Sequence, residues 1–250
     1  MKIREFGSDN KEMIILLHGG GLSWWNYRKE AELLQSDYHV VLPVLDGHAE
    51  SDRSFSSIED NAAEIIDLID ERYDGSVLLI GGLSLGAQVL LEMLSQRAGI
   101  CRYALVESAA VVPSRLTNIL IGPSFGMSYG LIRNRRFAEL QFKSLHMNED
   151  LFEDYYRDTC LIKKADMIAF LKANTAFQLK ESIKETAAQV HVIAGGKETR
   201  EIQKSLDVMK KTIPGCEVRV IPELYHGEFS LNHPDRYVDD LKRIVEGQTR

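Results

Sequence analysis

The segment Gly82-Leu-Ser-Leu-Gly86 places one serine between two glycines. An apolar run of strand length, residues 77–80, precedes it, and helix-forming residues 87–94 follow at once. This succession predicts a strand, a sharp turn and a helix, with glycines where a Cβ atom would collide and the serine hydroxyl projecting clear of the sheet. The five-residue pattern alone occurs by chance in roughly one chain in ten of this length. Its flanking elements favour Ser84 as a nucleophile over a plain glycine-rich turn between buried elements.

Other groups that could serve such a nucleophile also lie at the ends of apolar runs. His18-Gly19-Gly20-Gly21 ends the first such run, and consecutive glycines expose backbone N–H groups and permit close approach. We interpret this loop as half of an oxyanion hole, the alternative being a flexible connection. Glu198 follows the run 189–194, and His226 follows the run 216–222. A histidine can take the proton of a serine hydroxyl, and a carboxylate can orient the imidazole.

The elements that would position these groups alternate along the chain. Strands are predicted at residues 2–6, 13–18, 39–45, 77–80, 101–106, 189–194 and 216–222. Helical patterns separate most of them, so the sequence predicts an α/β fold with a doubly wound, mostly parallel sheet. Ligands bind at the carboxyl ends of the strands in such sheets. The candidate groups all follow strands, so they are expected to meet at one edge.

The alternation stops between residues 111 and 186, where the pattern is helical, with helices expected from Asn148 and from about Asp166. We therefore divide the chain into a core, residues 1–110 and 187–250, and an inserted helical cap, residues 111–186. The cap is predicted to roof the pocket. Its first loop, residues 121–130, is glycine-rich and is interpreted as contacting ligand through Met127 and Tyr129, or else as an ordinary connector. Gly21 and the two tryptophans that follow the glycine loop, Trp24 and Trp25, are candidate pocket residues, although tryptophans more often belong to the core.

The net charge, the cysteine count and the absence of long apolar runs argue against several classes of function. The 250 residues carry a net charge of −7 and no sustained basic stripe, which argues against nucleic acid or anionic membrane as a partner. The three cysteines are widely spaced and are expected to be free thiols. The N-terminus, residues 1–5, lacks the apolar core of a signal peptide, and no run approaches membrane-spanning length, so we expect a cytoplasmic protein, as monomer or homodimer.

The seven histidines indicate no cofactor or metal site, because they lack paired ligand spacing and no strand is followed by a dinucleotide fingerprint. His48, among turn-forming residues, is expected to hydrogen-bond locally. His191 is expected to be a core residue whose polar atoms are satisfied, and His233 to cap a helix that starts at Pro234.

The order serine, acid, histidine, together with the elbow around Ser84, resembles the α/β-hydrolase superfamily over essentially the whole chain. The similarity is specific at His18-Gly19-Gly20, at residues 82–86 and at Tyr225-His226-Gly227. It implies an α/β-hydrolase fold with a catalytic triad. It is weaker at the acid, because many members have Asp where this chain has Glu198; Glu201 and Glu107 are the alternatives.

The resemblance implies a division of roles. His226 activates Ser84, and Glu198 holds the imidazole. The backbone N–H groups of Leu85 and Gly20 bind the oxyanion, with Gly21 as the substitute donor.

The first hypothesis is a hydrolase of a small carboxylic ester or lactone, acting on an apolar or acyl small molecule. Proteins that this chain resembles also cleave C–C, thioester or amide bonds or transfer acyl groups, and these remain alternatives. A serine at the elbow disfavours haloalkane dehalogenase and epoxide hydrolase chemistry, which in similar proteins requires a carboxylate. A ligand receptor without turnover is the third possibility, although a receptor needs no activated nucleophile.

Overall fold

The computed structural model describes residues 1–247, with the side chains of residues 127 and 128 left undescribed. Its centre is a seven-stranded sheet in the order β1-β3-β2-β4-β5-β6-β7. The strands are β1 (Lys2–Phe6), β2 (Met13–Leu17), β3 (His39–Val44), β4 (Val77–Leu83), β5 (Cys101–Glu107), β6 (Gln189–Gly195) and β7 (Glu217–Ile221). Only the pair β1 and β3 is antiparallel, and the other neighbours run parallel. The predicted mostly parallel α/β sheet is confirmed.

The central strands are apolar along their whole length because helices cover both of their faces. All five residues of β2 are buried. Alternate side chains of a strand point to opposite faces. Ile15 and Leu17 accordingly join one hydrophobic core, whereas Ile14 and Leu16 join the other.

Each core is closed by its own set of helices. The first is covered by α2 (Ile58–Arg72), α3 (Leu85–Gln96) and α8 (Arg200–Thr212). The second is covered by the 3₁₀ helix η1 (Trp24–Tyr27), α1 (Arg28–Leu34), α9 (Glu228–Asn232) and α10 (Pro234–Val245). None of the helices described in residues 1–247 is both long and apolar enough to cross a membrane.

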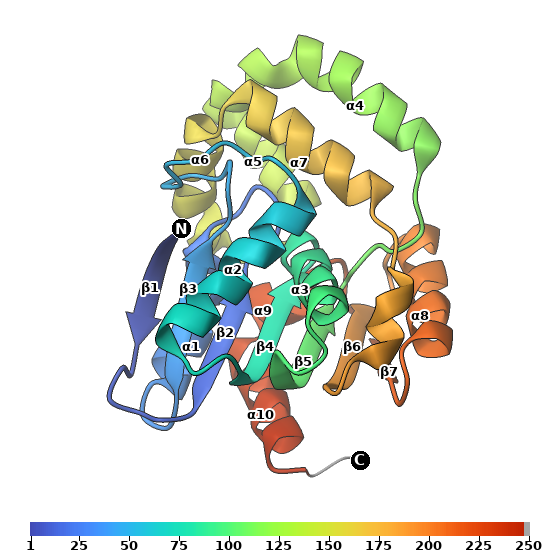
Figure 1. Ribbon diagram of the computed structural model, residues 1–250. Helices are drawn as coiled ribbons and strands as arrows, with labels where there is room; N and C mark the ends of the chain where they lie inside the picture. Colours follow the sequence, from blue (N-terminus) through green and yellow to red (C-terminus); the bar gives the residue numbers. More distant parts are fainter. Residues whose placement is uncertain (248–250) are drawn as a thin grey trace.

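A helical cap connects β5 to β6. It contains α4 (Arg115–Ser128), η2 (Tyr129–Arg133), α5 (Arg135–Ser144), η3 (Glu149–Leu151), α6 (Phe152–Leu161) and α7 (Lys164–Ala176), and η4 (Glu181–Glu185) leads back to the sheet. Figure 1 shows α4 to α7 above the carboxyl ends of the parallel strands. The helix α7 is fastened to the core, since Gln88 Nε2 donates to Asn174 O at 2.9 Å and Phe55 N donates to Asp166 Oδ1 at 3.0 Å.

The prediction of a loop over residues 121–130 is wrong. These residues form the second half of α4 and the start of η2, even though Pro123 lies inside the helix. Gly122, Gly126 and Gly130 do not use the positive φ that would have made them turn residues. The packing of α4 along α7 overrides the local preference, and Asn118 Nδ2 donates to Lys172 O at 2.7 Å in that contact.

Candidate active site

Ser84 lies in the tight turn between β4 and α3, with φ 51° and ψ −107°. A non-glycine residue with positive φ is strained, and such strain is typical of functional turns. A Cβ atom on Gly86 would lie 2.1 Å from Leu17 O, and one on Gly82 would lie 2.6 Å from Gly86 C. Both positions therefore require glycine, because the start of α3 passes directly over the end of β2 at Gly86 and over the end of β4 at Gly82.

His226 and Glu198 form a hydrogen-bonded pair. His226 Nδ1 lies 2.7 Å from Glu198 Oε2. The Glu198 side chain has no exposed surface, whereas the His226 side chain is 48% exposed. With Nδ1 donating to the carboxylate, Nε2 is the ring nitrogen that can accept a proton.

Two further donors hold the Glu198 carboxylate. Ser108 Oγ donates to Oε1 at 2.6 Å, and Gly195 N donates to the same oxygen at 3.0 Å. Burial by itself would raise the pKa of Glu198. The hydrogen bonds from His226, Ser108 and Gly195 outweigh it and hold the pKa below its usual value, so the carboxylate is ionised at neutral pH.

The two alternative acids have different surroundings. Glu107 is buried at the end of β5, and its Oε1 accepts from Ser230 N at 3.2 Å. Burial raises the pKa of Glu107 to about 7. Glu201 is exposed in the first turn of α8. The geometry thus favours Glu198 as the acid that serves His226.

The glycine loop is held by His18. Its Nδ1 donates to Gly19 O at 2.9 Å, and its Nε2 accepts from Leu45 N at 3.1 Å. Burial, with the neighbouring His48, lowers the pKa of His18 to about 3, so the ring is neutral as this bonding pattern requires. A Cβ atom on Gly20 would lie 3.5 Å from Leu85 Cβ. Gly20 and Leu85, the two predicted oxyanion donors, are therefore neighbours, whereas Gly21 has φ 80° and open space beside it.

These groups border one cavity of about 280 Å³ under the cap. Ser84, His226, Glu198 and Gly20 line it together. Its apolar surface comes from Leu22, Leu83, Leu145, Met147 and Leu231. The arrangement suits an acyl group that is presented to the serine hydroxyl.

The sequence pattern of the alpha/beta hydrolase family matches residues 14–240. The chain belongs to this family. No curated protein matches the sequence.

Solved structures share the α/β-hydrolase fold at low identity. An esterase from Exiguobacterium antarcticum superposes with a TM-score of 0.81 at 16% identity, covering 98% of this chain and 94% of that one. A thermophilic esterase from Thermogutta terrifontis gives 0.79 at 17% identity, covering 100% and 94%. The enol-lactonase from Burkholderia xenovorans LB400 gives 0.79 at 14% identity, covering 98% and 96%.

The predicted pocket walls need correction, because Trp24, Trp25 and Tyr129 lie outside the lining of the cavity that contains Ser84. Trp24 lies beside Arg4 and Arg28, with its Nε1 donating to Glu50 Oε1 at 3.1 Å.

The other two side chains serve packing within and under the cap. Trp25 is buried, and its Nε1 donates to Asp158 Oδ2 at 2.7 Å. The hydroxyl of Tyr129 donates to Ile162 O at 2.5 Å. Gly21 is also absent from the lining, and the side chain of Met127 lies outside the described residues.

The predictions for the other histidines have mixed outcomes. His48 hydrogen-bonds locally as expected, with Nδ1 donating to Asp46 O at 3.0 Å. The interpretation of His191 as a satisfied core residue is wrong for Nε2, which has no partner. His233 precedes α10, but its side chain makes no capping hydrogen bond.

Sequence reasoning missed two parts of this site. Ser108, which holds the acid, directly follows β5, so the rule that polar groups collect after strands could have identified it. The cap residues 144–147 also line the cavity, but no local pattern distinguishes them, because their position depends on how the cap folds back.

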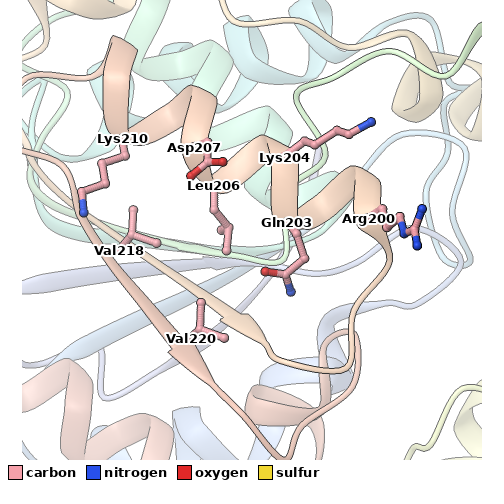
Figure 2. A pocket seen from close by; sticks show the side chains of 8 residues that line it. All are labelled: Arg200, Gln203, Lys204, Leu206, Asp207, Lys210, Val218 and Val220. Atoms are coloured by element: carbon pink, nitrogen blue, oxygen red, sulfur yellow. The ribbon is translucent and has the colours of Figure 1, made fainter.

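A second groove, of about 450 Å³, lies between α8 and β7 (Figure 2). In Figure 2, Leu206, Val218 and Val220 border the space between helix and strand, whereas the charged ends of Arg200 and Lys204 point away from it. None of the predicted catalytic residues lines this groove.

Within the described residues, no cluster of His, Cys, Asp and Glu is suited to a metal ion.

Proposed function

We propose that this member of the alpha/beta hydrolase family is a serine hydrolase that cleaves a small carboxylic ester or lactone through an acyl-enzyme on Ser84. One observation carries the proposal. Ser84 at a strained turn and His226, paired at 2.7 Å with the buried carboxylate of Glu198, line the same cavity. A nucleophile, a base and an acid in this relation are what acyl transfer requires.

The reaction begins with proton transfer. Ser84 is a poor nucleophile at neutral pH, so His226 removes its proton through Nε2 as the oxygen attacks the acyl carbon. The imidazole becomes positively charged at this step. Glu198 stabilises that charge and fixes the tautomer, because its carboxylate accepts the hydrogen bond from Nδ1.

The second requirement is a site for the negative oxygen of the tetrahedral intermediate. The backbone N–H groups of Leu85 and Gly20 are assigned to it, on adjacent segments that need no side chain for this purpose. His226 then protonates the leaving alcohol. Water attacks the acyl-enzyme by the reverse route, with His226 again taking the proton and then returning it to Ser84.

The size and lining of the cavity favour a small apolar acyl group. Its volume of about 280 Å³ lies just below the roughly 300 to 1,000 Å³ usual for ligand pockets. Esterases and a lactonase among the structural neighbours are in keeping with this choice, although at 14 to 17% identity they support the fold alone.

The test compares wild type with Ser84→Ala on p-nitrophenyl acetate and butyrate. We expect Ser84→Ala to lower kcat by at least about a thousandfold, and a fluorophosphonate probe to label wild type with one equivalent but to leave Ser84→Ala unlabelled. The matched control is Ser205→Ala, a buried serine on α8, which should keep wild-type labelling. Equal ester hydrolysis by Ser84→Ala and wild type would disprove the proposal.

The same triad could act on other bonds, and the same probe separates these possibilities. If the probe labels Ser84 but the enzyme turns over thioesters, amides or a C–C substrate and not esters, Ser84 is still the nucleophile and only the assigned substrate class is wrong. Tight ligand binding without labelling would instead support a receptor.

A further inference from the structure

A second pocket, open to solvent, lies beside the cavity that contains Ser84, between the cap and α9. It has a volume of about 470 Å³. Its lining consists of Glu139, Phe142, Lys143, His146, Met147, Glu149, Phe152 and Glu228. His146 and Met147 belong to both linings, so they form the wall between the two spaces.

The ring of His146 is stacked on the catalytic loop. It lies 3.7 Å from the ring of Tyr225, measured between centroids, with 8° between the planes. Tyr225 immediately precedes His226, so this part of the wall is adjacent to the proposed base.

The backbone around His146 is fixed from the core side. Asn232, at the end of α9, donates from Nδ2 to His146 O at 2.7 Å, and its Oδ1 accepts from Asn148 N at 2.7 Å. His146 itself has φ 55°. A non-glycine residue at such a φ is strained and persists only where surrounding contacts determine it. Here those contacts are the Tyr225 stack and the Asn232 bonds.

We propose that His146 determines the acyl-chain specificity of the hydrolase. This inference rests on the proposed function. The stacked, partly solvent-exposed ring stands between the 280 Å³ cavity and the 470 Å³ pocket, and in this position it limits the enzyme to short acyl chains. Without that ring the two spaces join, and the surfaces of Phe142, Met147 and Phe152 become available to medium-length uncharged chains.

A role in fastening the cap alone would have a different consequence. Loss of a fastening contact would reduce the hydrolysis of all esters by a similar factor. Loss of a wall changes the ratio of long to short substrates, because each additional buried methylene group contributes about 0.8 kcal/mol, or roughly fourfold. The ratio of rates is therefore the informative measurement.

The experiment measures kcat/KM for p-nitrophenyl butyrate and octanoate in wild type, His146→Gly and His146→Phe. Glycine tolerates the positive φ and removes the ring, whereas phenylalanine keeps a ring that can stack on Tyr225. We expect wild type and His146→Phe to prefer butyrate, and His146→Gly to raise the octanoate-to-butyrate ratio at least about tenfold. Leu140→Ala is the control, because Leu140 is exposed on α5 and lines neither cavity.

The outcomes separate this inference from the proposed function. Ester hydrolysis and labelling of Ser84 with an unchanged octanoate-to-butyrate ratio in His146→Gly would overturn the inference and leave the function intact. The inference is also overturned if His146→Phe shifts the octanoate-to-butyrate ratio as far as His146→Gly does. Absence of both hydrolysis and labelling in wild type would overturn both.

Discussion

The hydroxyl of Ser108 connects the acid to the loop that carries the base. Its Oγ donates to Glu198 Oε1 at 2.6 Å and accepts from Gly227 N at 3.4 Å. Ser108 is 1% exposed and has φ 56°. Because this buried side chain hydrogen-bonds both the candidate acid and the residue after the candidate base, we infer that Ser108 is a positioning residue.

Ser108→Ala is expected to lower kcat on p-nitrophenyl butyrate about tenfold with little change in KM. A hydrogen bond to a charged group contributes roughly 1.5 to 3 kcal/mol, and about 1.4 kcal/mol corresponds to a factor of ten in rate. Steady-state kinetics give both constants. Ser205→Ala removes a comparable buried hydroxyl, which donates to Glu201 O at 2.7 Å and accepts from Val111 N at 2.9 Å without contacting Glu198 or His226, and should keep the wild-type kcat. An equal fall in both variants would indicate a general loss of stability.

Glu107 makes stability depend on pH in a definite direction. Burial raises its pKa to about 7 from the usual 4.5, and Glu30, Tyr27 and Tyr237 interact with it in the same core. Between these two pKa values the folded chain keeps a proton that the unfolded chain releases. Its contribution to stability is therefore complete below about pH 4.5 and is lost as the pH rises through 7.

Glu107→Gln should accordingly raise the free energy of unfolding at pH 8 relative to wild type by about 1 to 3 kcal/mol. At pH 5 the two proteins should differ much less, since both side chains are then neutral. Urea unfolding at the two pH values measures the difference. An equal difference in the free energy of unfolding at pH 5 and pH 8 would contradict the raised pKa assigned to Glu107.

At the scale of elements, the elbow depends on the close approach of α3 to β2. Gly86→Ala should lower the free energy of unfolding by about 2 to 4 kcal/mol, because the new Cβ would lie 2.1 Å from Leu17 O and 2.6 Å from His18 O. Gly99→Ala is the control, since nothing lies within 4 Å of a Cβ there. Urea unfolding of both variants tests this. A similarly small effect at the two positions would show that the elbow relaxes easily.

The sequence predicted the elements that depend on local patterns. The strand β4, the turn at Ser84 and the helix α3 follow from one contiguous segment, and Glu198 and His226 follow from the rule that parallel strands end at one edge. The loop predicted over residues 121–130 was wrong because Pro123 and its neighbouring glycines were outweighed by packing against α7. The wall formed by His146 could not be predicted, because it depends on a contact with Tyr225 from a distant part of the chain.

At the scale of the molecule, two neutral histidines lie at the joint between core and cap. The His48 ring stacks on Phe170 of α7 with centroids 4.5 Å apart, and it meets His18 edge-on at 4.9 Å. Burial lowers the pKa of His48 to about 4 and, with the influence of His48, that of His18 to about 3. The unfolded chain binds protons at both below about pH 6.5, whereas the folded chain does not until its lower pKa values are reached. The contribution of these two histidines to stability therefore falls as the pH drops from about 6.5 towards 4, opposite in sign to that of Glu107.

Thermal unfolding of wild type and His48→Gln at pH 7 and pH 5 tests this consequence. Wild type should lose roughly 2 kcal/mol through His48 over that interval, and His48→Gln should lose less because glutamine does not titrate. His39→Gln, at a histidine outside this joint, is the control. Parallel losses in wild type and His48→Gln would contradict the prediction.

The contact of Gly86 with the end of β2 bears on how the substrate specificity of such a hydrolase can change by mutation. The two assigned oxyanion donors, Leu85 and Gly20, lie on segments held by the close approach of Gly86 to Leu17 O and His18 O, and none of the cap residues 144–147 that line the cavity is among the nearest contacts of Gly19, Gly20 or Gly86. Substitutions in the cap, at His146 for example, can therefore alter which acyl group enters while the charge-stabilising geometry stays the same. New substrates become accessible to natural variation or to directed evolution by single exchanges in the cap, without rebuilding the reaction centre.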